Sequence, residues 1–301
     1  YVCERNDLTR SNGRGRPTIP LELAETKGAH AGISVGTDST YIALFDLKGH
    51  TIRSVDIDIP VSRLSEDDFI QHIMAGLNRL SAGLNHPLCT VGVTTSGTVT
   101  SGGDVYAPNL GWDGVNLGEQ LREQFSVPVE VTSISSAIVG SEMQSSRELD
   151  TPSVMALFAD DSIACAISGA DGVDPIEVEQ GALTTQGLLD TIGEPTIRTL
   201  KDAVTDTRQI SREALDSRAR GLGSLVAELC STHCPTSVVV AGSAFIDDPL
   251  APAPFARTVR STVACSPELR MIPTHREMVR DIARAVALDL VLREPLAVAG
   301  R

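Results

Sequence analysis

The amino-acid sequence predicts an α/β protein of two lobes with a cleft between them. Its 301 residues are enough for about two hydrophobic cores. Hydrophobic residues make up 42% of the chain and charged residues 21%, which is typical of a folded globular protein and argues against disorder. A pattern of paired strands followed by helices occurs in each half of the sequence, and such units bury their apolar faces as separate layered lobes.

Alternating and continuous apolar runs define the elements of the first half. Ser65 begins a capping box, and a helical stripe that starts at Phe69 follows it. Strands are predicted at residues 31–35, 41–46, 51–57, 88–93 and 129–132, and helices after Ser65 and at residues 117–125 and 136–143.

The second half repeats the pattern with longer helices. Aromatic residues are only 3% of the chain, so both cores must consist of aliphatic side chains. Strands are predicted at residues 153–158, 163–168 and 237–241, and helices at residues 211–230 and 278–292.

Charge restricts the partners of the folded body. The chain has 39 acidic and 25 basic residues and a net charge of −14, which repels a nucleic-acid backbone. No apolar run could span a bilayer and no signal peptide is recognised, so we expect a cytoplasmic protein without a membrane partner. The six cysteines form no CxxC pair and are expected to be reduced; Cys230, His233 and Cys234 could supply three metal ligands.

Two segments carry the most information about function. The first reads Ala107-Pro108-Asn109-Leu110-Gly111-Trp112, and the second reads Pro128-Val129-Glu130-Val131-Thr132-Ser133-Ile134-Ser135-Ser136-Ala137. Together they resemble the sugar-binding core of the ROK family, which comprises repressors, open reading frames and sugar kinases. The resemblance implies an actin-like, ribonuclease-H-like (ASKHA) duplicated fold with an interlobe cleft. It also implies a first lobe of residues 29–133 plus 279–301 and a second of residues 134–278.

Departures from the kinase pattern imply that phosphotransfer has been lost. In ROK kinases an Asn-Asp pair supplies the catalytic base, whereas here Ser133 and Ile134 occupy these positions. A hydrocarbon side chain cannot accept a proton from a sugar hydroxyl. The first nucleotide loop is matched by residues 32–37, with Thr37 in place of a glycine.

The turn that matches the second phosphate loop is Ala159-Asp160-Asp161-Ser162-Ile163. Its carboxylates oppose nucleotide binding, although an acidic solvent-facing turn explains the same residues and is preferred. The turn beside the adenine in kinases is matched by residues 240–243, which a tight strand-to-helix turn explains equally well.

The family's zinc module is also altered. Gly181, Leu183 and Leu188 stand at its three cysteine positions, and none of them can bind a metal. We therefore expect no metal and no cofactor. Residues 171–190 are expected to be held by apolar packing of Leu183, Leu188 and Leu189, or to be mobile.

Four residues are predicted to contact a sugar-like ligand: Gly97, Asn109, Ser133 and Asp190. The Asn109 amide offers both a donor and an acceptor, which suits vicinal hydroxyls. A plain turn residue after Pro108 is the alternative for Asn109, and a helix-start acid is the alternative for Asp190.

The N-terminal residues suggest which branch of the family the chain resembles. Residues 11–17 resemble the segment that ROK repressors place after a winged helix-turn-helix domain, so residues 1–28 are predicted to be a linker after an absent DNA-binding head. Arg14 and Arg16 could contact the minor groove, or they could belong to a solvated linker.

The resulting hypothesis is a non-enzymatic regulator body that senses a sugar-like effector, forms a homodimer or homotetramer, and reaches operator DNA through the missing domain. An active sugar kinase and a dimerisation scaffold with a dead cleft are the alternatives.

Overall fold

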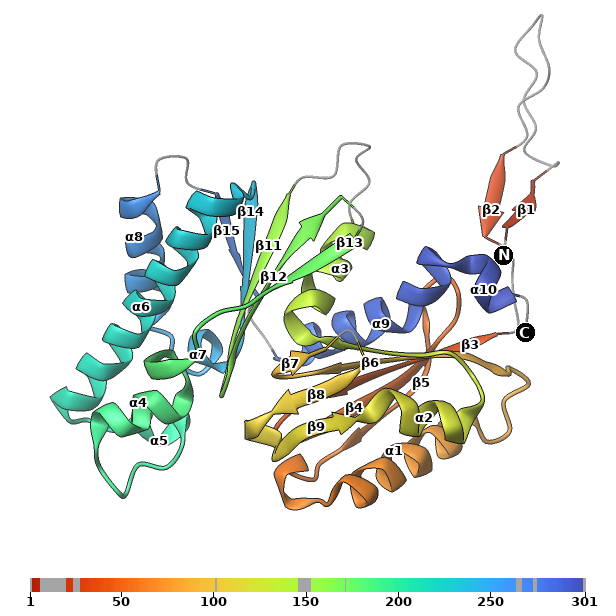
Figure 1. The fold of residues 1–301 in the computed structure, drawn as a ribbon, viewed down its shortest axis with the longest axis horizontal. Helices are drawn as coiled ribbons and strands as arrows, with labels where there is room; N and C mark the ends of the chain where they lie inside the picture. Colours follow the sequence, from red (N-terminus) through yellow and green to blue (C-terminus); the bar gives the residue numbers. More distant parts are fainter. Residues whose placement is uncertain are drawn as a thin grey trace, which may run out of the picture.

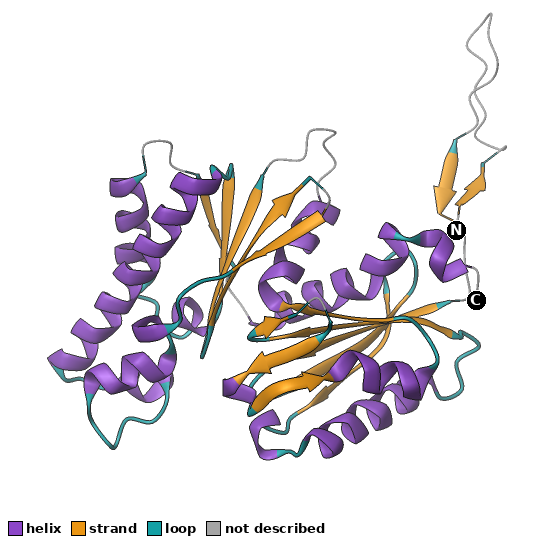
Figure 2. Cartoon of the chain, viewed as in Figure 1, coloured by secondary structure: helices purple, strands orange, loops and turns teal. Residues whose placement is uncertain are grey.

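Two five-stranded sheets, each covered by helices, form the two lobes of the protein (Figure 1). The computed structural model describes residues 2–5, 20–23, 28–100, 102–145, 153–170, 172–263, 267–272 and 275–299. Both lobes combine strands and helices, which Figure 2 colours orange and purple. The predicted two-lobed α/β fold is therefore confirmed.

The first lobe is a mixed sheet with strand order β10-β6-β3-β4-β5. The strands β3, β4 and β5 form an antiparallel meander, whereas β6 and β10 run parallel to β3 and to each other. The helices α1 and α2 cover one face, and their apolar stripes join the core around Leu44 and Val93. The bounds are β3 Ala29–Val35, β4 Thr40–Phe45, β5 Thr51–Ile57, α1 Glu66–Ser81, β6 Leu88–Thr95, α2 Leu117–Phe125 and β10 Val129–Ser133.

A small antiparallel sheet, which the sequence did not predict, extends the first lobe. It consists of β7 (Thr98–Val99), β8 (Asp104–Ala107) and β9 (Trp112–Asn116), with the short helix η3 (Pro108–Leu110) between the last two strands. Trp112 is 3% exposed and packs edge-on against Phe69, with ring centroids 5.0 Å apart. This contact packs the start of β9 against α1 in the core.

The second lobe has strand order β13-β12-β11-β14-β15. The strands β11, β12 and β13 are antiparallel, and β14 and β15 continue the sheet parallel to β11. The long helix α6 packs against α8 on one side of this sheet. The bounds are β11 Val154–Ala159, β12 Ile163–Gly169, β13 Gly172–Ile176, η4 Gly181–Leu183, α4 Thr185–Ile192, α5 Leu200–Thr205, α6 Gln209–His233, β14 Ser237–Ala241, α7 Ser243–Ile246, α8 Pro252–Thr262 and β15 Glu268–Met271.

The helices α3 (Ile134–Ser145) and α9 (His275–Arg293) join the lobes. The helix α9 lies on β3 and β6, α3 lies on β11 and β12, and the two helices pack against each other. Glycines of β3 and β6 permit the close approach of α9 to the first sheet. A Cβ on Gly32 would lie 1.9 Å from the Ala283 carbonyl oxygen, and one on Gly92 would lie 2.1 Å from that of Val286. The short helix α10 (Pro295–Ala299) follows α9.

The N-terminal region differs in part from the predicted linker. The strands β1 (Val2–Glu4) and β2 (Leu21–Leu23) pair antiparallel in a ribbon (Figure 1), and three-residue strands are too short to produce a recognisable period. Arg14 and Arg16 lie outside the described residues. None of the helices in the described ranges combines the length and the apolar character that a membrane span requires.

Candidate functional site

A chain of polar side chains crosses from the first lobe to the second. Asn109 Nδ2 donates to Ser96 Oγ at 3.0 Å and to Thr37 Oγ1 at 3.2 Å. Thr37 Oγ1 in turn donates to Asp161 Oδ2 at 3.1 Å. Thr37 lies between β3 and β4, and Asp161 lies between β11 and β12 of the other sheet. The two turns that match the nucleotide loops of kinases are therefore bonded directly to each other.

Local backbone geometry places Asn109 at the start of this chain. Pro108 begins η3 because its fixed φ suits the first helical position, and Gly111 ends η3 at φ 78°. Asn109 is half-buried, so its amide is partly accessible to a small molecule. Both amide hydrogens already have hydroxyl partners, and vicinal hydroxyls of a ligand could replace them.

Gly97 is required by packing within the first lobe. It adopts φ 86°, and a Cβ there would lie 2.2 Å from the Tyr106 carbonyl oxygen on β8. The glycine therefore allows β7 and β8 to approach each other. Its contact with a ligand stays a prediction.

Ser133 and Ile134 stand where β10 ends and α3 begins. The Ser133 hydroxyl accepts a hydrogen bond from the Ser136 amide at 3.2 Å and bonds to the hydroxyls of Ser135 and Ser136. It therefore caps α3 and is 8% exposed. Ile134 is 5% exposed and packs in the apolar cluster with Ile138 and Phe158. No proton acceptor occupies the position of the kinase base.

Asp190 has its hydrogen-bond partner within its own helix. It is exposed on α4 and accepts a hydrogen bond from Gln186 Nε2 at 2.7 Å within the same helix. Within the described part of the chain, it forms no hydrogen bond to Gly97, Asn109 or Ser133. The structure thus joins Asn109 to Ser96 and Thr37, two hydroxyl residues that were not on the predicted list.

The acidic turn after β11 is not the solvent-facing turn that we preferred from the sequence. Asp160 and Asp161 are both half-buried. The Asp160 carboxylate accepts a hydrogen bond from Ser243 Oγ, and the Asp160 carbonyl accepts one from Thr185 Oγ1 at 3.2 Å. Bonds to the protein's own hydroxyls thus occupy this turn. Beside it, a Cβ on Gly242 would lie 2.1 Å from the Ala159 carbonyl oxygen, which supports the tight-turn interpretation of residues 240–243.

Arg218 of α6 holds this turn through hydrogen bonds to backbone carbonyls, and the sequence did not predict it. Its Nη2 donates to the Asp160 carbonyl and its Nε to the Leu183 carbonyl, both at 2.7 Å. The side chain is 5% exposed, and burial lowers the pKa of Arg218 to about 10, although Asp160, Asp161 and Asp248 oppose the shift. The guanidinium therefore stays charged at neutral pH. Arg218 falls between Leu215 and Leu222 on the apolar stripe of the helix, and this position was the sequence signal that its side chain is buried.

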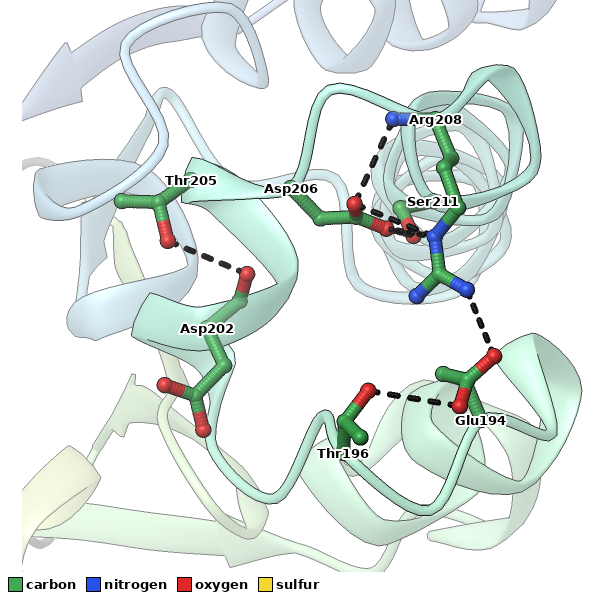
Figure 3. Close-up of polar contacts among 7 residues, drawn as sticks. All are labelled: Glu194, Thr196, Asp202, Thr205, Asp206, Arg208 and Ser211. Carbon is green, nitrogen blue, oxygen red and sulfur yellow. Dashed lines mark hydrogen bonds and ion pairs between the residues drawn. The ribbon is translucent and has the colours of Figure 1, made fainter.

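Apolar packing holds the leucines of the segment that matches the zinc module. Leu188 and Leu189 join a cluster with Ile192 and Leu215, whereas Leu183 packs on the core of the second sheet. Further along the chain, Arg208 bridges Glu194 and Asp206, and Asp206 accepts a hydrogen bond from Ser211 (Figure 3).

Metal binding finds little support in this region. The described residues contain no group of three or more His, Cys, Asp or Glu side chains placed to hold a metal. Burial raises the pKa of Cys230 to about 11, so its thiol is protonated at neutral pH. The absence of zinc stays a prediction.

The fold defines a class: an actin-like α/β protein of two lobes. In this chain, the two turns that resemble phosphate loops are hydrogen-bonded to each other. The sequence model described as the ROK family matches residues 30–158. Residues 30–158 are therefore similar to the ROK-family domain.

Curated relatives and solved structures agree with this assignment. Transcriptional regulators of Mycobacterium bovis and Mycobacterium tuberculosis are 29% identical over 288 residues, which cover 82% of this chain. The match spans 65% of the length of these relatives.

Solved structures show the same fold at low identity. A ROK family transcriptional regulator, described as a homolog of the E. coli MLC protein, has a TM-score of 0.71 at 16% identity, covering 99% of this chain and 87% of its own. A ROK family glucokinase from Streptomyces griseus, in complex with glucose and AMPPNP, has a TM-score of 0.62 at 16% identity, covering 87% and 99%. Regulators and kinases thus share this architecture, and the site residues must distinguish between them.

Proposed function

We propose that this chain is the ligand-sensing and oligomerisation body of a ROK-family transcriptional regulator, with kinase chemistry lost. The effector is a small polyhydroxylated, sugar-like molecule. Operator DNA is bound through a separate N-terminal domain, with Arg14 and Arg16 as candidate minor-groove contacts. The names of the mycobacterial relatives support the regulator assignment.

The direct contact between Thr37 and Asp161 carries the proposal. A nucleotide phosphate between these turns would replace a hydrogen bond at 3.1 Å and would meet the Asp160 and Asp161 carboxylates. The phosphate and the two carboxylates are all negatively charged, and like charges repel each other strongly in a half-buried site. Ile134 removes the base as well, so positioning, charge stabilisation and proton transfer are all lost.

Asn109 supports retention of ligand binding. Its amide is half-buried and bonded to two hydroxyls, an arrangement that sugar hydroxyls can take over without leaving a buried donor unsatisfied. A scaffold with a dead cleft would have no need for such an exchangeable group.

A thermal-shift screen tests the proposal. Hexoses, amino sugars and sugar phosphates are each added to the purified protein, and a ligand that binds only the folded state must raise its unfolding temperature. The Asn109→Ala variant should lose the shift, because an unsatisfied partner weakens binding by roughly tenfold or more. Asn78→Ala, on the exposed face of α1, is the matched control and should keep the shift. A shift that survives Asn109→Ala would place the ligand elsewhere.

A further inference from the structure

The contact between Thr37 and Asp161 joins two lobes that α3 and α9 also link. Both side chains are half-buried, so water competes only partly for the hydrogen bond. The Thr37 backbone is anchored in its own lobe, because its carbonyl accepts a hydrogen bond from the Val61 amide at 3.0 Å. The two turns can separate only if this side-chain bond breaks.

Asn109 directs the Thr37 hydroxyl toward the second lobe. A threonine hydroxyl has one hydrogen to donate and two lone pairs to accept with. Since Asn109 Nδ2 donates to Thr37 Oγ1 at 3.2 Å, the hydroxyl hydrogen must point elsewhere, and it points to Asp161 Oδ2. The second amide hydrogen goes to Ser96, so the amide itself is held in one orientation.

Backbone contacts present Asp161 from the opposite side. The Asp161 carbonyl accepts a hydrogen bond from the Thr185 amide at 3.2 Å, and Arg218 holds the neighbouring Asp160 carbonyl. These bonds fix the turn through its main chain and leave the Asp161 carboxylate to face Thr37. The buried guanidinium also reduces the cost of holding two carboxylates in one half-buried turn.

We propose that Thr37 and Asp161 form an interlobe latch, which Asn109 sets by orienting the Thr37 hydroxyl. A polyhydroxylated effector that accepts hydrogen bonds from the Asn109 amide competes with Thr37 for that donor. The Thr37 hydroxyl then loses its orientation, and the latch is weakened. Effector binding is in this way coupled to opening of the cleft. The latch stands on the contacts alone, whereas its release by an effector rests on the proposed function.

Amide hydrogen exchange on the full chain without ligand tests the latch. Thr37→Val removes the hydroxyl at nearly constant volume and should speed exchange of the Thr185 amide, in the opposite lobe, by about three- to tenfold. Asp161→Ala should speed exchange of the Val61 amide in the first lobe by a similar factor. Asn109→Ala should also speed exchange at Thr185, because the Thr37 hydroxyl loses its orientation.

Conservative variants separate the latch from a local structural effect. Thr37→Ser and Asp161→Asn retain a hydroxyl donor and an oxygen acceptor, and both should exchange like the wild type. Thr100→Val is the matched control, because it removes the Thr100 to Asp104 hydrogen bond of 3.4 Å within one hairpin; it should leave Thr185 and Val61 unchanged.

Two results would overturn the latch. One is wild-type exchange at Thr185 in a folded Thr37→Val protein, and the other is an Asp161→Asn variant that exchanges as fast as Asp161→Ala. A sugar screen without hits would count against the proposed effector, while the exchange measurements would still decide on the latch.

Discussion

Arg218 shows how one buried side chain can stabilise a whole turn. It satisfies two carbonyl groups from separate segments, and its charge offsets those of nearby aspartates. We expect Arg218→Met to lower the free energy of unfolding by about 2–4 kcal/mol. The Leu183 carbonyl loses its guanidinium donor, the Asp160 carbonyl keeps only that from Thr185, and the nearby acidic groups lose the compensating charge. Chemical denaturation measures this loss. Arg220→Met, on the exposed side of the same helix, should change stability little, and an equal effect of both variants would contradict the assigned role.

His30 makes stability depend on pH. It is buried on β3, its Nδ1 lies 2.8 Å from Thr90 Oγ1, and Thr90 donates in turn to the Ala287 carbonyl at 3.0 Å. Burial lowers the pKa of His30, although Asp46 opposes the shift. Below about pH 6.5 the unfolded chain binds a proton that the folded protein binds less readily, so stability falls as the pH falls through this range.

The variant His30→Gln isolates this contribution. The difference in unfolding temperature between pH 7.5 and pH 5.5 should be smaller in His30→Gln than in the wild type. His233→Gln is the control variant, because His233 is exposed and its substitution leaves the contact between His30 and Thr90 in place. A pH dependence that His30→Gln leaves unaltered would mean that other groups cause it.

At the scale of the element, apolar periodicity was sufficient for the long strands and helices. The bounds of β5, α2 and β14 match the predicted residues, because each has a clear apolar pattern between turn signals. The helix α3 begins at Ile134, two residues before the predicted start, because Ser133 and not a later serine caps it. The sheet β7-β8-β9 was missed because its strands are short and their pairing depends on Gly97, whose conformation has no periodic signal.

The polar site could be predicted less completely than the elements. Asn109 follows from its motif, but its bond to Thr37 joins residues 72 apart, and the Thr37 to Asp161 bond joins residues 124 apart. Such contacts depend on how the two sheets are placed, which a local pattern does not specify. For the same reason, Asp190 could be matched to a family position without evidence that it lies near Asn109.

The approach of α9 to the first sheet provides a prediction at this scale. Gly92→Ala would bring a methyl group against the backbone of α9, and backbone cannot rotate away as a side chain can. We expect a loss of about 1–3 kcal/mol in unfolding free energy, typical of overpacking, or more if α9 must shift. Gly140→Ala is the matched control. Nothing lies within 4 Å of the added methyl there, and alanine is the better helix former, so that variant should be neutral or stabilising.

For the whole molecule, the loss of phosphotransfer is the main expectation. Incubation with Mg-ATP and a panel of hexoses should release no ADP above a protein-free blank, because the base position and the phosphate turn are both altered. Asp161→Gly should not restore turnover, since Ile134 still occupies the base position. ADP release that co-purifies with the protein and disappears in Asn109→Ala would instead support the kinase alternative.

The edge-on contact between Trp112 and Phe69 also provides an optical probe. Trp112 is the single tryptophan of the chain, and it follows Asn109 by three residues. Its indole ring therefore dominates the intrinsic fluorescence, and the η3 backbone connects it to the polar chain across the cleft. Binding of an effector to the Asn109 amide should change the Trp112 emission without any added label. Titrations can therefore follow binding in the native protein. Because the ring is buried, its emission should also report the melting of the first lobe separately from that of the second.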